Sequence, residues 1–485
     1  MNQAMTEEAS ALHTNRAVPL CIDLDGTLIR SDLLVESALA LIASNPLTVF
    51  AMLVWMLRGK AYLKQQIAQR IALDIATLPY NQEVLEWVRE QQKLRPVVLC
   101  TASDHSLADA VAAHLGGFSA VLASDGQHNL SGRNKAQALI ALYGERGFDY
   151  AGNATIDLQV WRHAHSAIVV ETSARLSKAA ASVTGVDRSF KIPRTSLRIW
   201  AKALRMHQWI KNVLVFLPLL AAHRIFDPAA VSSSLLAFLC FGLCASSVYV
   251  TNDLLDLGAD RLHPRKRRRP FAAGALPLLA GPVAAIALLV SSFVLAWFVA
   301  PAFLEVLLGY YVLTTAYSLR FKRIMMLDVV VLSMLYTTRI LAGAAAVKTF
   351  PSFWLLAFSM FIFLSLAMVK RYTELVSALK LGKVTANGRG YDVDDIPLIQ
   401  SMGSSSGYLA VLVLALYIDS TASQALYKHP HYLWLLCPLL LYWISRVWAI
   451  AHRGIMHDDP VVFAVMDNVS RVLLALAAII IVVSV

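Results

Sequence analysis

Charged side chains are scarce in this chain of 485 residues, in which they make up 15% against 57% hydrophobic residues. Such a composition excludes an ordinary soluble protein and is typical of a polytopic membrane protein. Acidic residues are the rarer sign, with 32 Asp and Glu against 43 Lys and Arg. The resulting charge of +11 lies largely beside apolar segments, where the positive-inside rule explains it. No stretch resembles a nucleic-acid-binding motif, so we expect no nucleic acid partner.

Cysteine is also rare, and its five copies form no CxxC pair and no spacing typical of a metal site. They are expected to be small core residues in a reducing compartment. An apolar leader is missing as well, because residues 1–16 are polar. We expect these residues to be a flexible tail and the amino-terminal domain to stay in the cytoplasm.

Apolar residues are distributed unevenly, which predicts two domains. Five short apolar runs with turn-like ends, separated by helical stretches, predict an α/β domain with a mostly parallel sheet. These runs are residues 17–23, 96–100, 120–123, 148–152 and 166–170. We expect this domain over 17–190, a helical cap over about 33–92, a basic linker over 191–204 and an all-α membrane domain over 205–485. The cap contains an apolar stretch, but Asn45-Pro46 and the charges of Arg58 and Lys60 argue against a spanning helix.

The second domain contains nine segments that are long enough to span a bilayer or nearly so. They are residues 209–225, 230–252, 277–300, 302–320, 326–347, 353–370, 404–420, 432–450 and 468–485. With a cytoplasmic amino terminus, the loops rich in Lys and Arg all lie on the cytoplasmic side. The polar clusters gather there too, which favours an enzyme that joins a cytoplasmic substrate to a lipid over a transporter with ionisable groups at mid-membrane.

An acidic cluster lies where one of these apolar helices ends. Asp253, Asp256 and Asp260 are spaced by three and four residues, which places them on one face of a helix. A dense run of Arg and Lys follows directly. Carboxylates at this density suit Mg²⁺, and the adjacent cations suit a phosphate-rich ligand. The sequence therefore predicts a site for magnesium and diphosphate at the membrane surface.

Four motifs in the first domain resemble those of the haloacid dehalogenase (HAD) superfamily, in its phosphatase branch. They are Asp23-Leu24-Asp25-Gly26-Thr27-Leu28, Thr101-Ala102-Ser103, Lys135 after Ser131-Gly132, and Gly152-Asn153-Ala154-Thr155-Ile156-Asp157. The resemblance covers about residues 17–190 and implies a Rossmann-like fold with a helical cap.

The HAD resemblance also implies roles for these residues. Asp23 would be the nucleophile, Asp25 the general acid/base, and Thr101 and Lys135 the phosphate binders. The implied magnesium ligands are Asp23, Asp25, Asn153 and Asp157. A carboxylate can attack a phosphate only when its charge is neutralised, which Mg²⁺ and a lysine achieve. Asn153 stands where many relatives carry aspartate, so weaker metal binding, or a fold that has lost catalysis, is the alternative.

The membrane domain resembles the UbiA superfamily of intramembrane prenyltransferases over about residues 200–485. In that superfamily two acidic motifs usually hold magnesium and a prenyl diphosphate. The first is present as Asn252-Asp253-x-x-Asp256-x-x-x-Asp260. The second departs from the pattern, because Asp328 has no paired aspartate and Arg339 follows eleven residues later.

Several fragments resemble one branch of this superfamily, the decaprenyl-phosphate phosphoribosyltransferases. They are Arg205-Met-His-Gln208-Trp209-Ile-Lys211-Asn212, His263-Pro264-x-Lys266-x-x-Arg269-Pro270, Lys370-Arg371-Tyr372-x-Glu374, and Asp458-Asp459-Pro460 up to Asp467. The resemblance implies transfer of phosphoribose from 5-phosphoribosyl diphosphate to a polyprenyl phosphate at the cytoplasmic face of a bacterial-type inner membrane. A fused phosphatase would then remove the ribose 5-phosphate.

The expected site of the transferase follows from this resemblance. Asp253 and Asp256 would hold Mg²⁺ and be catalytic. The residues expected to bind substrate are Lys211, Asn252, Asp260, Arg261, Lys266, Arg269, Lys322, Asp328, Arg339, Lys370 and Arg371. Simpler roles stay open: Lys370 and Arg371 as interfacial anchors, and Arg339 as a structural partner of Asp328.

Two other functions are compatible with the sequence. The first is prenyl transfer from a prenyl diphosphate to an aromatic or other small acceptor, against which the missing second aspartate pair argues. The second is a lipid-binding or transport protein with a regulatory HAD domain. That protein would show no magnesium-dependent turnover and would tolerate Asp253→Ala.

Overall fold

A computed structural model describes residues 17–171, 174–382, 390–456 and 459–485. The chain forms two compact units, an amino-terminal unit of residues up to 204 with 250–284, and a membrane unit of residues 205–249 with 285–485. The two units are not two consecutive parts of the sequence, because a segment from the middle of the chain belongs to the amino-terminal unit.

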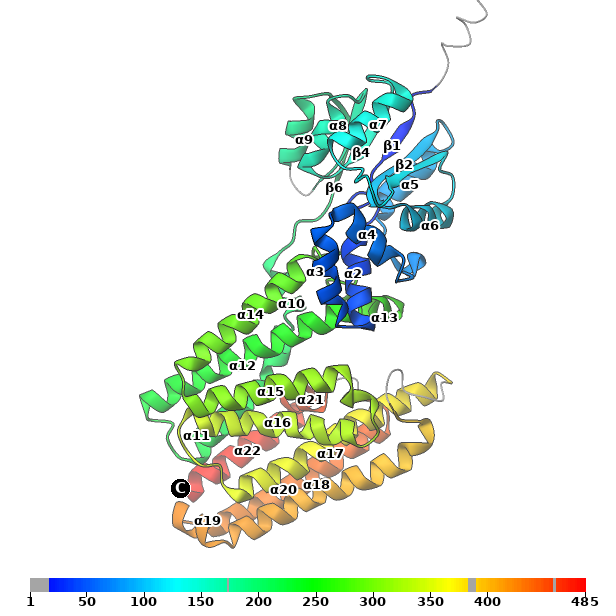
Figure 1. Ribbon diagram of the computed structural model, residues 1–485. Helices are drawn as coiled ribbons and strands as arrows, with labels where there is room; N and C mark the ends of the chain where they lie inside the picture. The colour runs from blue at the N-terminus through cyan, green and yellow to red at the C-terminus, as the bar shows by residue number, and fades with distance from the viewer. Residues whose placement is uncertain (1–16, 172–173, 383–389, 457–458) are drawn as a thin grey trace, which may run out of the picture. The chain divides into compact units, whose positions relative to one another are not determined.

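A six-stranded sheet forms the centre of the amino-terminal unit (Figure 1). Its strands are β1 (Leu20–Ile22), β2 (Val97–Asp104), β3 (Ala120–Ser124), β4 (Asp149–Gly152), β5 (Ser166–Glu171) and β6 (Gly185–Lys191). The order is β3-β2-β1-β4-β5-β6, and all neighbouring strands run parallel. The prediction of an α/β fold with a parallel sheet is confirmed. The sixth strand was not among the predicted runs.

Helices cover both faces of this sheet. Alternate side chains of each strand point to opposite faces, and the apolar ones on each face pack against helices. Leu20 and Ile22 of β1 pack with α5 (Gln82–Gln91) and α6 (His105–Leu115). Cys21, between them, packs on the other face with three further helices. These are α7 (Arg133–Tyr143), α8 (Leu158–Trp161) and α9 (Ala174–Ala181).

A helical insertion separates β1 from β2. It consists of α2 (Leu33–Ser44), α3 (Thr48–Leu57), α4 (Lys60–Ala68) and the 3₁₀ turn η1 (Ile75–Thr77), and it is called the cap below. Asp32 begins α2 by accepting a hydrogen bond from the Val35 amide at 3.1 Å. The helix ends at Ser44, before Asn45-Pro46, because proline disfavours helical backbone in the residue before it.

The segment 250–284 of the amino-terminal unit lies between two long apolar helices. It comprises the end of α12 (Pro228–Leu255), α13 (Leu257–Leu262), η4 (Lys266–Arg268) and the start of α14 (Ala280–Trp297). We call it the connecting segment. It packs tightly on the rest of its unit. A Cβ on Gly274, whose φ is +65°, would lie 2.8 Å from the Arg30 Cβ and 3.1 Å from the Arg30 carbonyl oxygen.

The membrane unit is helical throughout its described part. Besides most of α12 and α14, its elements are η3 (Met206–Phe216), α11 (Leu217–Ala221), α15 (Pro301–Leu319), η5 (Phe321–Arg323), α16 (Leu327–Ala346), α17 (Phe353–Lys380), η6 (Val393–Asp395), α18 (Ile396–Ile418), α19 (Thr421–Leu426), η7 (Pro430–Leu435), α20 (Leu436–His452), α21 (Pro460–Met466) and α22 (Asn468–Ser484); α10 (Leu197–Ala203) precedes it.

The predicted number of nine spanning helices is not confirmed. Among the described residues, seven helices are long and apolar enough to cross a membrane, or eight if α21 and α22, which meet at 77°, form one broken span. The segment expected at 209–225 is instead a 3₁₀ stretch followed by the five-residue helix α11. Pro218 stands at the start of α11, where proline is tolerated, and its missing N–H would interrupt a continuous helix running through this position.

Helix α16 lies at the centre of the membrane unit, and 61% of its apolar 18-residue stretch is buried. It packs backbone to backbone against η3, because a Cβ on Gly343 would lie 2.0 Å from the carbonyl oxygen of Val215. Small residues allow such close approach between helices in membranes.

The close contact at Gly343 predicts a strong effect of one added methyl group. Gly343→Ala must push η3 away from α16, at a cost of about 1–3 kcal/mol. Gly309→Ala in α15 is the matched control, because its new Cβ would meet nothing within 4 Å. Thermal unfolding in detergent should show a lower midpoint for Gly343→Ala alone. Equal midpoints for the two variants would contradict this packing.

Candidate functional site

Polar residues gather at the carboxyl ends of the central strands of the amino-terminal unit. Asp23 follows β1, Ser103 lies near the end of β2, and Asn153 follows β4. The chain leaves β1 for β2 and β3 on one side, then returns to β4 on the other. A crevice at such a reversal of strand order is where open parallel sheets bind their ligands. This edge is called the sheet site.

A buried chain of hydrogen bonds begins at Asp23. The ammonium group of Lys135 donates to the Asp23 Oδ1 at 2.8 Å and to the Tyr150 hydroxyl at 2.8 Å. That hydroxyl donates to the Asp157 Oδ1 at 3.2 Å. Burial lowers the pKa of Lys135, but the neighbouring groups Asp23, Cys100 and Asp157 together outweigh it, and the pKa lies above its ordinary value. Lys135 is therefore a permanent cation beside Asp23.

Asp25 joins the sheet site to the cap. Its Oδ1 accepts a hydrogen bond from the amide of Leu33, the first residue of α2, at 2.8 Å, and its Oδ2 accepts one from Ser103 at 2.6 Å. Burial, followed by the charges of Asp32 and Asp23, raises the pKa of Asp25 to about 7. Asp25 is thus a carboxyl group that can hold a proton near neutral pH.

Thr101 is fully buried in the same site. Its hydroxyl oxygen accepts a hydrogen bond from the Ser103 amide at 3.0 Å. The turn between these two residues therefore places Ser103 against Asp25.

The predicted magnesium ligands of the sheet site form only part of a shell. Among the described residues, no three His, Cys, Asp or Glu side chains are placed to hold a metal ion. Asp157 is used as a structural acceptor, because its Oδ2 takes the amides of Asn153 at 3.0 Å and Ala154 at 2.9 Å. The Asn153 side chain lies directly over Gly26, where a Cβ would come within 2.0 Å of the amide nitrogen. Oxygen donors from Asp23 and Asn153 suit Mg²⁺, which keeps several waters and phosphate oxygens as ligands.

The acidic cluster of the connecting segment is not on one continuous helix, contrary to the prediction. Helix α12 ends at Leu255, Asp256 is the cap residue, and α13 begins at Leu257. Asp253 and Asp260 nevertheless converge on one cation. The Arg269 guanidinium donates to Asp253 at 3.1 Å and to Asp260 at 2.6 Å. Both carboxylates are buried, and Asp256 is half-buried.

The other predicted binders of this segment differ in their surroundings. Arg261 was expected to bind substrate, but its guanidinium is buried in a two-pronged ion pair with Glu36 of the cap, at 2.6 and 3.1 Å. Its Nε donates to the Ala272 carbonyl oxygen at 3.1 Å. These contacts use all three guanidinium nitrogens of Arg261. Lys266 is exposed and Asn252 half-buried.

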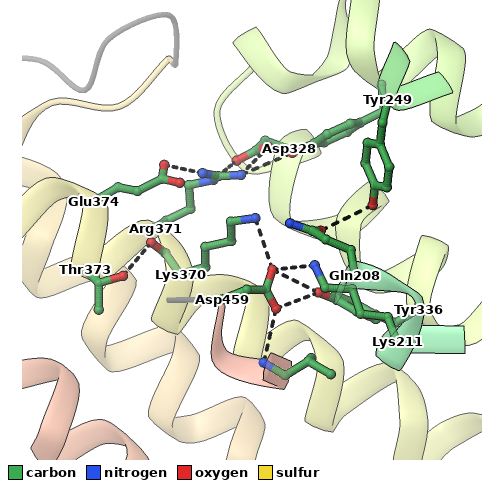
Figure 2. A network of polar contacts seen from close by, with 12 residues as sticks. Gln208, Lys211, Tyr249, Asp328, Tyr336, Lys370, Arg371, Thr373, Glu374 and Asp459 are labelled. Atoms are coloured by element: carbon green, nitrogen blue, oxygen red, sulfur yellow. Dashed lines mark hydrogen bonds and ion pairs between the residues drawn. The ribbon is translucent and has the colours of Figure 1, made fainter. Parts of the chain in front are cut away.

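In the membrane unit, two predicted lysines converge on a residue that was not among the predicted ligands (Figure 2). Lys211 donates to the Asp459 Oδ2 at 2.7 Å, and Lys370 approaches the same oxygen at 3.3 Å. The Tyr336 hydroxyl donates to the other oxygen at 3.3 Å. Two ammonium groups against one carboxylate leave this cluster, called the lysine cluster, with an excess of positive charge.

Asp459 could have been found from its sequence context. It caps α21 by accepting the Val461 amide at 3.1 Å, and Pro460 follows at the first helical position. An aspartate before a proline is a common helix start. This pattern does not indicate that distant lysines would meet the same carboxylate. Asp458, in the same predicted fragment, lies outside the described residues.

Arg339 lies beside the lysine cluster and is not the partner of Asp328. Its Nε donates to the Asn212 Oδ1 at 2.9 Å, and a terminal nitrogen donates to the Tyr310 hydroxyl at 3.1 Å. The side-chain amide nitrogen of Asn212 is buried without a hydrogen-bond partner among the described residues. A buried donor of this kind usually has a bound water or ligand as its partner.

Asp328 instead pairs with Arg371, and both are almost completely buried, with 0% and 1% of their side chains exposed. The Arg371 guanidinium also donates to the Tyr317 hydroxyl at 3.1 Å and contacts Glu374 (Figure 2). Arg371 is therefore not an interfacial anchor. The second acidic motif has become an internal ion pair, while Lys322 of η5 is half-buried.

These features define a polytopic membrane protein with two polar sites and a cationic cluster. Residues 213–469, more than half of the chain, match the UbiA prenyltransferase family. The chain belongs to this family.

Three relatives extend the comparison. The uncharacterized protein y4nM of Sinorhizobium fredii is 36% identical over 469 residues, which are 96% of this chain and 90% of the relative. The nodulation protein NoeC of Azorhizobium caulinodans is 38% identical over 274 residues, 56% of this chain and 89% of the relative. The decaprenyl-phosphate phosphoribosyltransferase of Mycobacterium tuberculosis is 39% identical over 185 residues, 37% of this chain and 61% of that enzyme.

The buried pair of Asp328 and Arg371 predicts strongly non-additive mutations. Arg371→Met leaves Asp328 as an uncompensated buried charge and should cost about 3–5 kcal/mol. The double variant Asp328→Asn with Arg371→Met removes both charges and should recover much of that loss. Thermal unfolding in detergent measures both. Losses that simply add would show that the two side chains do not pair.

Proposed function

We propose that this protein is a bifunctional enzyme of lipid glycosylation. Its membrane unit transfers phosphoribose from 5-phosphoribosyl diphosphate to a polyprenyl phosphate, and its amino-terminal unit removes the ribose 5-phosphate. The two sites belong to the cytoplasmic side of a bacterial-type inner membrane, in agreement with the Lys- and Arg-rich loops of the sequence.

The lysine cluster is the observation that carries this proposal. Lys211 and Lys370 meet a single carboxylate, and the Asn212 amide nitrogen offers a buried donor nearby in the sequence. Such a set of donors suits a phosphate group, which replaces the carboxylate as the partner of the lysines. A second magnesium cluster would need carboxylates instead, and Asp328, the acid of the second motif, is paired with Arg371.

The connecting segment suits the diphosphate of the donor substrate. Asp253 and Asp256 would hold Mg²⁺, which would neutralise the leaving diphosphate. Arg269 balances the negative charges of Asp253 and Asp260. Its guanidinium would also suit the phosphate oxygens of a diphosphate bound at this segment. The oxygen donors of this motif fit the preference of Mg²⁺.

The transfer requires no general base. An oxygen of the polyprenyl phosphate, already ionised, attacks C1 of the ribose, while the bond from C1 to the diphosphate oxygen breaks. The diphosphate leaves with the electron pair of that bond. The ribose carries positive charge at the transition state, so positioning and electrostatic stabilisation supply most of the catalysis.

The sheet site suits the second step. Asp23 would attack the 5-phosphate, Lys135 would neutralise the phosphate oxygens, and Asp25 would donate a proton to the leaving ribose oxygen. Water would then hydrolyse the phosphorylated Asp23. The four motifs that resemble the HAD superfamily support this assignment, and Mg²⁺ bound at Asp23 and Asn153 would add further charge neutralisation.

The name of the mycobacterial relative, a decaprenyl-phosphate phosphoribosyltransferase, agrees with this choice of substrates. Family membership alone also favours a second candidate, prenyl transfer from a prenyl diphosphate to a small acceptor. One experiment separates the two. Purified protein in detergent with Mg²⁺ receives either radiolabelled 5-phosphoribosyl diphosphate with decaprenyl phosphate, or a labelled prenyl diphosphate with an aromatic acid. A labelled transfer product that forms only from the second pair would overturn the phosphoribosyl transfer.

The two-step scheme predicts separable effects at the sheet site. Asp23→Asn removes the nucleophile and should leave transfer unchanged, so that the lipid retaining its 5-phosphate accumulates. Thin-layer chromatography of the labelled lipid before and after treatment with an unrelated phosphatase measures this. Glu90→Gln, on the exposed surface of α5, is the control. Normal release of the dephosphorylated lipid by Asp23→Asn would disprove the second step.

Substitutions in the acidic cluster should impair the transfer reaction and spare the phosphatase reaction. Asp253→Ala or Asp256→Ala should lower transfer by about 10²–10³-fold, because the charge of the leaving diphosphate is no longer balanced. Hydrolysis of a soluble phosphate ester at the sheet site should persist in both variants and shows that the protein is folded. Unchanged transfer would remove these aspartates from the site and would favour the lipid-binding alternative.

A further inference from the structure

One face of an apolar helix in the cap is exposed. Helix α3 reads TVFAMLVWML, and this helix, described in full, contains no buried residue. Phe50, Leu53, Val54 and Leu57 lie at spacings of three and four and are 56–89% exposed. An amphipathic surface helix would place polar residues on this face.

The opposite face of α3 explains how the helix is held in place. Met52 and Trp55 pack against Leu41 of α2 and against Leu63 and Ile67 of α4. Helix α3 is therefore apolar on both sides: one side completes the cap, and the other, which we call the outer stripe (Phe50, Leu53, Val54 and Leu57), is left for something outside the unit. A contiguous exposed apolar face marks an interaction site.

The charges around the outer stripe indicate what that partner is. From residue 37 to residue 73 the sequence has four Lys or Arg and no Asp or Glu. Arg58 and Lys60, which follow α3 directly, are exposed, and the Arg70 guanidinium lies 4.7 Å from the Trp55 ring. Apolar side chains bordered by cations match the acyl chains and anionic headgroups of a membrane surface.

An ion pair holds the cap close to the ends of two candidate membrane spans. Glu36 of α2 receives two hydrogen bonds from Arg261 of α13, at 2.6 and 3.1 Å, and a third from Ser31 at 2.6 Å. Arg261 and Glu36 are 7% and 3% exposed. Because α13 directly follows α12 and the connecting segment continues into α14, this pair holds the cap against the segment that joins these two helices.

We propose that α3 is an interfacial helix that inserts its outer stripe into the cytoplasmic leaflet. It would enter to a depth of about 5–10 Å, as helices of this kind do. Resting on the proposed function, this insertion lets the sheet site receive a lipid-linked phosphate directly from the bilayer. The cap helices α2 and α4 also line a small pocket together with Ser103, the hydrogen-bond partner of Asp25.

Fluorescence quenching tests the insertion. All five native cysteines are buried, so Leu53→Cys offers one accessible thiol for a bimane label. The labelled full-length protein is placed in nanodiscs of phosphatidylcholine and phosphatidylglycerol that contain doxyl-labelled lipid. We expect several-fold stronger quenching at position 53 than for Glu90→Cys, which lies exposed on α5. Equal quenching at the two positions overturns the proposal, as does disulfide crosslinking between two copies of the unlabelled Leu53→Cys variant when the labelled variant shows no quenching.

An activity measurement tests the consequence. The double variant Phe50→Asp with Leu53→Asp should hydrolyse the lipid-linked ribose 5-phosphate several-fold more slowly in nanodiscs than the unaltered protein. Its hydrolysis of soluble p-nitrophenyl phosphate should be unchanged. An equal loss on both substrates, or no loss on either, overturns delivery from the leaflet. If the unaltered protein hydrolyses neither substrate, the proposed function fails, and the quenching result still decides whether α3 is inserted.

Discussion

Buried ion pairs between residues that are distant in sequence organise the polar architecture of this protein. Removing an ion from water costs far more than an isolated contact returns. Three buried acids have a partner of opposite charge: Asp328 pairs with Arg371, Asp459 with Lys211, and Glu36 with Arg261. These pairs fix helices that are distant in sequence against each other. They also separate the charged residues that maintain the fold from those that remain available to a ligand.

The parts of the fold that could be predicted from the sequence are those with a distinctive apolar pattern. The central strands of the sheet are buried on both faces and read as continuous apolar runs, so their positions were recognisable. Strand β6 reads GVDRSFK and is mostly exposed, so its composition resembles that of a loop. The spanning helices were recognised by their length and apolar character. Residues 209–225 pass the same criterion, but hydropathy does not reveal a 3₁₀ stretch or the break at Pro218.

The sequence motifs predicted which residues belong to the candidate sites, but not which residues these side chains pair with. The positions of Asp23, Asp25 and Lys135 follow from strand ends and from a resemblance, and Lys135 indeed lies 2.8 Å from Asp23. The ion pair of Arg261 could not be predicted, because its partner, Glu36, lies 225 residues away in the chain. Asp459 was absent from the predicted ligands for the same reason, since Lys211 is 248 residues distant. Long-range pairing of charges leaves no local trace in a single sequence.

The compact units and the chain order do not coincide, and this has a consequence for how such a protein can be divided. The basic linker around residues 191–204 looks like a seam between two independent modules. The amino-terminal unit, however, includes the connecting segment 250–284. A chain divided at the linker would leave Glu36 on one fragment and Arg261 on the other, and each would lose its buried ion-pair partner. The boundary of the amino-terminal unit therefore does not coincide with the linker, and a fragment that keeps this unit intact would have to include the connecting segment.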